Sequence, residues 1–564
     1  MASYNRPKVI LRDSLGAITS THKYEHQAVD SAKNEGPGTY TLERPDGTYV
    51  GGEGVYAPDI PNTPGAFAVT SPSSSTASLS WTDNSIDETG FEIERSPDGS
   101  TGWVLLNTTE VDITGYLNTN LSAATTYHYR IRAVNISGNS PYTPVVQVTT
   151  DVAGDLETSI LANYNFLPQD AEGYSILTPS ADSRLIYVDP TGGDNGTAVN
   201  YTTATLPSGT WDDPSGVSAY QDLATAVGQM RQDHPDYLLL KSGEVFTTND
   251  YIRIYSGRSL TERAVVTAYG TGARPSIDPT GDFEAIRIWN YGNFIAIKGL
   301  QFHPTFRSPN HANFAGWGST AGNHAVLIWT SSNHPPKQGV IVEDCHGLYC
   351  NTAISVSSGY GPNLLAGSDI IIRRNIIEYS YSETGHSQGI KAYRYSALLE
   401  DNVLDHNGWL IQSFDGTKSQ GQGTIYNHNI YCGESGYDYL MRNNISARTS
   451  SLGIKMTANP KSGVNEIYIT DMLIKDNLII DAEVGMSLGG NDDEEDGPRW
   501  NNIKVTGNVL TKLGESRPTN RDLAWGIEVD DWASGEVSGN LLHGYGSDVV
   551  TNTIPIHVKG ATTT

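Results

Sequence analysis

The chain has 564 residues, of which 37% are hydrophobic and only 18% are charged, and it contains 58 glycines and 31 tyrosines against 10 phenylalanines. This mix suits many short strands joined by tight turns, and it excludes a disordered chain because the apolar content is ample. The formal net charge of −27 argues against nucleic acid and anionic membranes as partners, since both require basic surfaces.

Three cysteines, Cys345, Cys350 and Cys432, are too few for a disulfide framework, and we expect them to be small buried apolar residues. The first twenty residues lack the apolar segment of a signal peptide, and no stretch approaches the length of a membrane span. We therefore expect a protein that stays inside the cell or leaves it by lysis, unless a secretion signal has been removed.

Residues 1–58 read as a small α+β module, with a strand at 9–11 and a short helix at 26–34. A Pro-Gly turn and a further strand follow within GPGTYTLERPDGTYVGG. In its order of elements, and most sharply in PGTYTLERPDG, the module resembles small N-terminal modules of tailed-phage virion proteins. The resemblance implies an anchor that contacts other virion proteins.

Residues 59–151 contain short alternating stretches such as SLSWTDNS, GFEIERSPDG and TYHYRIRAVN, separated by turn signals. This segment resembles fibronectin type III domains. Trp81 stands where that family has its core tryptophan, and Tyr127 takes the tyrosine-corner position. The resemblance implies a spacer or an adhesive module. Residues 152–185 follow as a linker without a clear period.

A phrase of alternating apolar and polar residues, then Asn, then an apolar pair recurs along the last part of the chain, at intervals of 27 to 42 residues. Its asparagines are Asn375, Asn402, Asn444, Asn477, Asn508 and Asn540, and Cys345 occupies the same slot one repeat earlier. Such spacing of short alternating strands predicts a β-solenoid. We expect each Asn to adopt the left-handed conformation at a sharp corner and to hydrogen-bond to the Asn of the next coil. The long interval from 402 to 444 holds either an extra coil or a loop at 415–424.

A second phrase lies between the corners, and its apolar residues should point inward while their neighbours point outward. These apolar residues are Ile390, Ile430, Ile454, Met486 and Ile527. At the start, LIYVDPTGGDNG predicts a strand, WDDPSGVSAYQDLATAVGQM a capping helix, and DYLLLKSGEVF the first coil. With LLLKSGEVF and AYGTGARPSID, residues 186–564 resemble the right-handed parallel β-helix proteins of the pectate-lyase-like superfamily. The expected fold class is therefore all-β, with the helix preceded by the sandwich and the small module.

The outward positions of the second phrase form two predicted rows on one face of the solenoid. The first row is Lys391, Tyr431, Lys455, Ser487 and Glu528; the second is Tyr393, Gly433, Thr457, Gly489 and Asp530. Arg394, His428 and Asn429 flank them. Aromatic rings, cations and small residues on one face are what a glycan groove needs. We assign substrate contact to Tyr393, Asn429, Thr457 and Ser487.

Two reactions fit this face. In a β-elimination on a uronate polymer, Lys391 or Lys455 is the candidate base, Tyr431 or His428 the acid, and Arg394 the group that neutralises the carboxylate. In a glycoside hydrolysis, Glu528 and Asp530 are the candidate carboxylates, because side chains at i and i+2 of a strand lie ~7 Å apart. Of the two, elimination is preferred. The alternative is a polar face and a solvated acidic edge without catalysis.

The segment NDDEEDG at 491–497 is rich in carboxylates, and Asp492, Asp493 and Asp496 are candidate ligands for Ca²⁺. The alternative is a charged solvent loop. The chain lacks the short motifs of nucleotide-binding loops, zinc proteases and acyl-serine enzymes, so those chemistries have no support.

Three functions remain open. The first is a tailspike-like or fibre-like virion protein that binds a host surface polysaccharide and, in a stronger form of the hypothesis, also depolymerises it. The resemblance to tailspikes implies a homotrimer. The second is an extracellular polysaccharide lyase or glycoside hydrolase. The third is a structural or adhesive virion protein without catalysis.

Overall fold

The computed structural model places the chain in two compact units, residues 1–154 and 155–564. It describes residues 9–12, 18–22, 39–43, 54–55, 60–72, 76–118, 121–122, 124–150, 156–290, 292–316, 324–331, 334, 337–358, 367–382, 386–410, 423–433, 436–457, 469–489, 500–519, 521–530, 532–545 and 552–559. No helix among these residues has the length and apolar character needed to cross a membrane.

The first unit begins with a four-stranded antiparallel sheet in the order β2-β1-β3-β4. Its strands are β1 (Val9–Arg12), β2 (Ile18–His22), β3 (Thr39–Glu43) and β4 (Gly54–Val55). The predicted strand at 9–11 is β1. The helix expected at 26–34 lies outside the described residues, so the helical part of this module stays a prediction.

The rest of the first unit is a sandwich of two antiparallel sheets. One sheet holds β5 (Gly65–Pro72), β6 (Ala77–Thr82) and β9 (Gly115–Asn118); the other holds β7 (Gly90–Ser96), β8 (Val104–Thr108), β10 (Thr126–Asn135), β11 (Gly138–Asn139) and β12 (Val146–Thr149). Trp81 packs edge-on against Phe91 in the core, with ring centroids 5.6 Å apart. The Tyr127 hydroxyl accepts a hydrogen bond from the Ser122 backbone N–H at 2.9 Å, as the predicted tyrosine corner requires.

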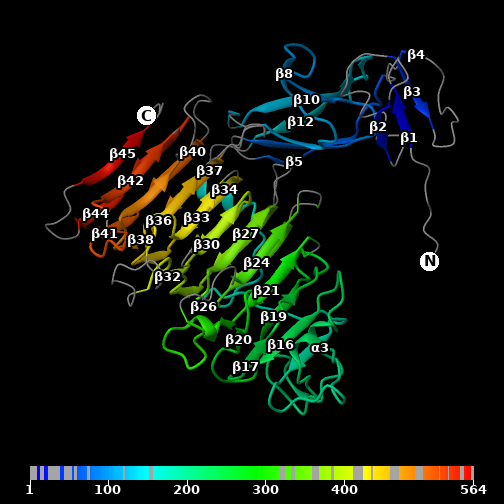
Figure 1. The fold of residues 1–564 in the computed structure, drawn as a ribbon. Coiled ribbons are helices and arrows are strands. Elements are labelled where there is room, and N and C mark those ends of the chain that lie inside the picture. Colours follow the sequence, from blue (N-terminus) through cyan, green and yellow to red (C-terminus); the bar gives the residue numbers. More distant parts are fainter. Residues whose placement is uncertain are drawn as a thin grey trace. The chain divides into compact units, whose positions relative to one another are not determined.

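The second unit is a stack of coils whose strands form three parallel sheets, an arrangement compatible with a β-helix (Figure 1). Sheet 1 consists of β13 (Leu185–Val188), β16 (Tyr237–Lys241), β19 (Ala264–Tyr269), β22 (Ile295–Lys298), β25 (Lys337–Glu343), β28 (Gly367–Arg373), β31 (Ala397–Glu400), β34 (Gly436–Arg442), β37 (Ile469–Lys475), β40 (Trp500–Thr506) and β43 (Gly535–Ser538). Sheet 2 consists of β17 (Val245–Thr248), β20 (Ser276–Pro279), β23 (Gln301–Phe302), β26 (His346–Leu348), β29 (Ile376–Glu378), β32 (Val403–Asp405), β35 (Ile445–Ala447), β38 (Leu478–Ile480), β41 (Val509–Leu513) and β44 (Leu541–Tyr545). Sheet 3 consists of β18 (Ile252–Arg253), β21 (Ile286–Trp289), β24 (His324–Thr330), β27 (Thr352–Ser358), β30 (Gln388–Tyr393), β33 (His428–Gly433), β36 (Leu452–Thr457), β39 (Val484–Leu488), β42 (Ala524–Asp530) and β45 (Thr553–Lys559).

Each coil runs through sheets 1, 2 and 3 in turn, and its inward side chains fill one continuous apolar core. Across the interval from 402 to 444, β31 pairs directly with β34 and β32 with β35, so the described strands leave no place for an extra coil between them. Most of the predicted loop at 415–424 lies outside the described residues. All three cysteines are buried in this core as free thiols, and burial raises the pKa of each to about 12. The prediction of inert apolar cysteines is confirmed.

The asparagines form a continuous hydrogen-bonded ladder at the corner between sheets 1 and 2. The Asn402 Nδ2 group donates to Asn444 Oδ1 at 2.9 Å, and the same contact joins every neighbouring pair from Asn375 to Asn540. Each Nδ2 group also donates to a main-chain carbonyl, such as Ile372 O for Asn402. The expected ladder is therefore confirmed.

The conformational part of that prediction is wrong, because the left-handed residue is the one before each Asn. Positive φ angles occur at Arg374, Asp401, Asn443, Asp476, Gly507 and Gly539, and also at Asp344 before Cys345. The Asn must turn its amide into the corner to reach main-chain carbonyls, so the sharp turn falls on its exposed predecessor. Asp and Asn tolerate this conformation better than most residues.

A helix caps the start of the solenoid, as predicted, but it is much shorter than the expected helix at 211–230, whose first part contains a strand instead. The short helix α3 (Leu223–Val227) begins at Asp222, whose carboxylate accepts from the Thr225 N–H, and Leu223 and Ala226 join the core. A small hairpin, β14 (Ser208–Gly209) with β15 (Pro214–Ser215), precedes this helix. A 3₁₀ turn, η1 (Thr305–Arg307), follows β23.

Residues 156–184, expected as part of a linker, instead lie along the outer face of sheet 1 as a strap that begins with α2 (Leu156–Leu161). The Tyr164 hydroxyl donates to Asp438 O at 2.7 Å, and Ile160, Tyr164 and Leu167 cover a row of outward apolar side chains. That row is Ala296, Ile341, Ile371, Leu398, Leu440 and Leu473. Strands that are apolar on both faces need such a cover, and the strap supplies it.

Candidate functional site

The outward face of sheet 3 brings together the first predicted row in perfect register. Lys391 pairs with Tyr431, Tyr431 with Lys455, Lys455 with Ser487 and Ser487 with Glu528. The register extends the row to Arg253, Arg287, Leu327 and Ser355 before Lys391, and to His557 after Glu528. Because coils of a parallel sheet stack about 4.8 Å apart, this row is a ladder of side chains along the solenoid.

Aromatic rings and cations alternate on this face. The Lys391 ammonium lies 4.6 Å from the centroid of the Tyr393 ring, and Tyr393 meets Tyr431 edge-on at 5.1 Å. Both tyrosines and the lysine are partly exposed. Rings held by neighbouring cations and rings keep a fixed orientation, which suits contact with the flat face of a sugar.

Three further residues of this surface were missed in the sequence. Trp289 pairs with Trp329 in the register of the second row, with ring centroids 4.9 Å apart, and the Arg287 guanidinium lies 5.0 Å from the Trp289 ring. The sequence does carry a signal for them, because IRIW and LIWT repeat the alternation of the second phrase three and two coils before QGIKAY. We call Arg287, Trp289, Trp329, Lys391, Tyr393, Tyr431 and Lys455 the aromatic–cationic face.

The far end of the first row is acidic and hydrogen-bonded. The Lys455 ammonium donates to Ser487 Oγ at 3.0 Å, and Ser487 Oγ donates to Glu528 Oε2 at 2.6 Å. His557 Nδ1 lies 3.6 Å from the other Glu528 oxygen, and the His557 ring packs on Trp525. Ser487 is buried, so its hydroxyl links the Lys455 ammonium to the Glu528 carboxylate and is not open to a ligand.

Besides Ser487, four more of the predicted site residues are buried. Arg394 is 3% exposed and Thr457 2%, so neither presents an open group to a polymer on this face. Asn429 is fully buried and points into the corner, where its amide donates to Leu404 O and Ser446 Oγ. These positions adjoin the turns between sheets, where the strict alternation of a strand no longer holds.

His428 is also buried, and it packs edge-on against the Tyr431 ring at 5.2 Å. Burial, followed by the charge of Lys455, holds the pKa of His428 well below 6.5. The imidazole is therefore neutral at neutral pH and lacks the second ring proton that a histidine gives up as a general acid. Of the two candidate acids, Tyr431 alone is accessible on the face.

Glu528 and Asp530 lie two positions apart on β42, as expected, and both are partly exposed. Asp492, Asp493 and Asp496 fall outside the described residues, so a Ca²⁺ site in that loop stays a prediction.

A second ladder of rings follows the strands of sheet 2. Tyr349, Tyr379 and His406 stack at 5.3–5.4 Å, each in the left-handed conformation after its strand. The His406 ring is 2% exposed, and Asp405 and Arg448 pair beside it. The alternation of the strands did not predict this ladder, because its residues stand at turns.

Comparison with known proteins identifies one part of the chain. Residues 62–149 match the family model "Fibronectin type III domain". A curated relative, human "Myosin-binding protein C, fast-type", is 32% identical over 118 residues, which are 20% of this chain and 10% of that protein. The chain therefore spans about a tenth of the length of that relative.

Among solved structures, "Crystal Structure of FN3tt" is 31% identical and covers 17% of this chain and 98% of that chain, with a TM-score of 0.15. The solution structure of the third fibronectin III domain of human KIAA0343 protein is 20% identical and covers 19% and 95%, with a TM-score of 0.16. The molecule is thus an all-β modular protein in which a fibronectin type III domain accompanies long parallel sheets.

Proposed function

We propose that the aromatic–cationic face of sheet 3 binds an acidic polysaccharide whose chain runs along the solenoid. The observation that carries the proposal is the in-register ladder of Lys391, Tyr431 and Lys455, with Trp289 and Trp329 on earlier coils. The three successive coils of β30, β33 and β36 offer a ring or a cation about every 4.8 Å, close to the repeat of sugars in a linear polymer, and one coil that carries Ser355 separates them from Trp329. In a protein with a net charge of −27, cations gathered on one face favour an anionic ligand.

Binding is better supported than cleavage. The elimination set loses Arg394 and His428 to burial, which leaves Tyr431 as the acid and Lys391 or Lys455 as the neighbouring base. Their adjacency in the register is the observation that favours a lyase as the second candidate. Hydrolysis at Glu528 is less favoured, because one oxygen of that carboxylate already accepts from Ser487.

We propose that the whole molecule is a tailspike-like virion protein, which is the biological setting of this binding. The order of parts supports it: a small N-terminal sheet as anchor to other virion proteins, a fibronectin type III domain as spacer, and a solenoid as the receptor-binding rod. In this setting the polysaccharide is on the host surface and the rod is a homotrimer. Mass spectrometry of purified phage particles would find the chain in the virion if the setting is right.

The binding proposal predicts the behaviour of two variants in affinity gel electrophoresis. Acidic polymers such as polygalacturonate, alginate and acidic bacterial surface polysaccharides are cast into the gel, with dextran as the neutral comparison. We expect retardation by at least one acidic polymer, and Trp329→Ala and Lys391→Ala should each weaken it about tenfold, which corresponds to the loss of one contact of ~1.4 kcal/mol. Tyr379→Ala, which removes a ring from the sheet 2 ladder, should leave retardation unchanged.

Equal retardation of all four proteins, or none by any acidic polymer, would contradict the proposal. The same mixtures report on cleavage. A rise in ultraviolet absorbance that Lys391→Ala abolishes would make the protein a lyase, whereas new reducing ends without that absorbance would indicate hydrolysis.

A further inference from the structure

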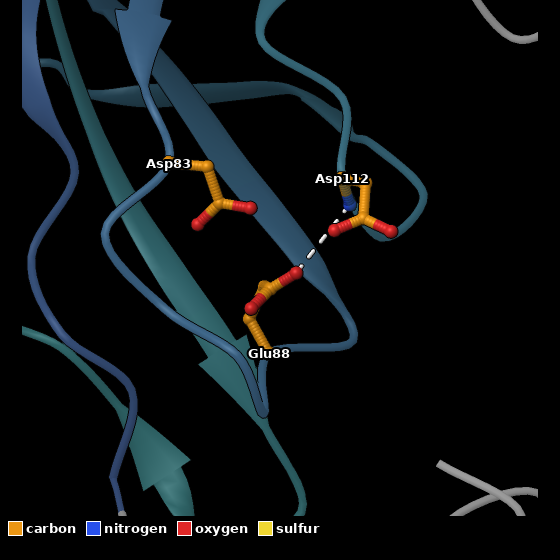
Figure 2. Close-up of side chains that lie close together, drawn as sticks. All are labelled: Asp83, Glu88 and Asp112. Carbon is orange, nitrogen blue, oxygen red and sulfur yellow. Dashed lines mark hydrogen bonds between the residues drawn. The ribbon is translucent and has the colours of Figure 1, made fainter. Parts of the chain in front are cut away.

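Three carboxylates converge at one end of the sandwich in the first unit (Figure 2). Asp83 follows the end of β6, Glu88 precedes the start of β7, and Asp112 lies in the turn between β8 and β9. One oxygen from each residue lies within 4.8 Å of the other two. In Figure 2 the Glu88 carboxylate lies below Asp83 and Asp112, and a dashed line joins it to the Asp112 N–H.

The Glu88 carboxylate is buried and lacks a full set of hydrogen bonds. Glu88 is 2% exposed, and its Oε2 atom has no hydrogen-bond partner in the described part of the chain. Its Oε1 atom accepts a long bond from the Asp112 N–H, at 3.4 Å. Burial raises the pKa of Glu88, and the charges of Asp83 and Asp112 raise it further. A buried carboxylate in such surroundings is costly unless a positive charge neutralises it.

The spacing of these oxygens suits a hard divalent cation. Ca²⁺ binds carboxylate oxygens at 2.3–2.6 Å, so two oxygens on one ion lie at most about 5 Å apart. Asp83 Oδ1 is engaged by the Ser85 N–H, and the ion would use its remaining oxygen. Ligands made only of oxygen favour Ca²⁺ or Mg²⁺ over zinc, and the loop positions favour the more adaptable Ca²⁺.

We propose that Asp83, Glu88 and Asp112 bind Ca²⁺ and that the ion joins the two sheets of the sandwich. Asp83 ends a strand of the three-stranded sheet, whereas Glu88 leads into a strand of the five-stranded sheet. Asp112 lies on the connection back from the second sheet to the first. An ion at this point holds together the β6–β7 and β8–β9 crossings between the sheets, and it stabilises the folded domain by mass action.

The test uses the full chain with and without Ca²⁺ or Mg²⁺, after treatment with a chelator. We expect millimolar Ca²⁺ to raise the Tm of the unit that contains the sandwich by a few degrees, since sites of this kind in extracellular modules bind at roughly 10⁻⁴–10⁻³ M. Glu88→Gln should lose the shift, while Glu110→Gln, an exposed neighbour in the same connection, should keep it. In chelator, Glu88→Gln should be at least as stable as the parent, because it removes a repelled charge.

Terbium luminescence gives a second readout that does not depend on unfolding. Trp81 lies two residues before Asp83 and is buried, so it is placed to sensitise Tb³⁺ bound by the cluster. We expect sensitised emission that Ca²⁺ displaces and that Glu88→Gln reduces at least tenfold. Absence of any Ca²⁺ shift in the parent would overturn the proposal. So would a shift that survives Glu88→Gln but is lost when Asp492, Asp493 and Asp496 are changed to Asn. A response to Mg²⁺ equal to that of Ca²⁺ would overturn the choice of metal.

Discussion

Glu343→Gln is expected to lower the free energy of unfolding of the solenoid unit by about 3–5 kcal/mol, the usual cost of removing one partner from a buried ion pair. Glu343 is fully buried on the outer face of sheet 1, where the strap covers it. Its carboxylate accepts from the Ser175 N–H at 2.7 Å and from Ser175 Oγ at 2.6 Å. Lys298 and Arg373 lie 3.6 and 3.7 Å from its two oxygens, in the register positions before and after it.

The cost arises because the charges of this row alternate from Lys298 to Arg442. Lys298, Glu343, Arg373, Glu400, Arg442 and Lys475 follow one another on successive coils, and Glu157 of α2 pairs with the last two. Removing the charge of Glu343 leaves two cations under the strap without their central partner. Glutamine keeps the size of the side chain, so the loss reports on charge and not on packing.

Chemical denaturation measures the difference, and Glu536→Gln is the matched control. Glu536 pairs with Lys504 at 3.8 Å on the same sheet, but its side chain is 57% exposed, so its loss should change the unfolding free energy by less than about 1 kcal/mol. Hydrogen exchange adds a local readout, because the Ser175 amide should exchange faster once its acceptor is weakened. Equal losses of unfolding free energy in Glu343→Gln and Glu536→Gln would show that the buried charged row stabilises the fold no more than an exposed ion pair does.

The repeating parts of the molecule were predictable because two periodic signals coincide. The Asn phrase marks the corner between sheets 1 and 2, and the second phrase marks sheet 3. Parallel coils share one register, so aligning Ile390, Ile430 and Ile454 as inward residues also aligned Lys391, Tyr431 and Lys455 on the outside. The outward row was therefore readable from the sequence alone.

The prediction of exposed site residues is wrong at positions where the chain enters or leaves a strand. Asn429 and Ile430 are adjacent and both fully buried, because the corner between sheets 2 and 3 turns two successive side chains away from solvent. Arg394 stands one residue after β30 with a positive φ, so alternation says nothing about its direction. Whether such residues are covered depends on neighbouring coils, and a single sequence does not contain that information.

The strap escaped prediction for a related reason. It has no period because it follows the surface of sheet 1 and contacts it through isolated side chains such as Tyr164 and Ser175. The sequence of the sheet 1 strands instead indicates that their outer face is covered. Runs such as VIV and III are apolar at successive positions, which means that both faces of those strands are buried.

A pH-dependent stability difference is expected between the parent and Lys337→Met. Lys337 begins β25 and is fully buried, and its Nζ atom has no hydrogen-bond partner in the described ranges. Burial lowers the pKa of Lys337 from 10.5 to about 7. Between pH 7 and 10.5 the unfolded chain therefore carries a proton that the folded chain has released, so raising the pH favours the folded state.

The size of the stability difference follows from the same pH range, between 7 and 10.5. Each pH unit contributes about 1.4 kcal/mol, so the lysine should cost on the order of 4 kcal/mol at pH 7 and little at pH 10. Methionine has a similar length and no charge to bury. Lys337→Met should thus be more stable than the parent by several kcal/mol at pH 7, and the difference should shrink steadily toward pH 10.

Urea denaturation at a series of pH values measures this difference, and Lys504→Met is the control because that side chain is 44% exposed. Subtracting the parent at each pH removes the titration of every other group that the two proteins share. A difference that does not change with pH would mean that the folded protein accommodates the charged ammonium, whereas a less stable Lys337→Met at pH 7 would mean that the ammonium holds β25 in place. The predicted slope requires a folded state in which the amine is neutral, because only then does the unfolded chain bind the extra proton.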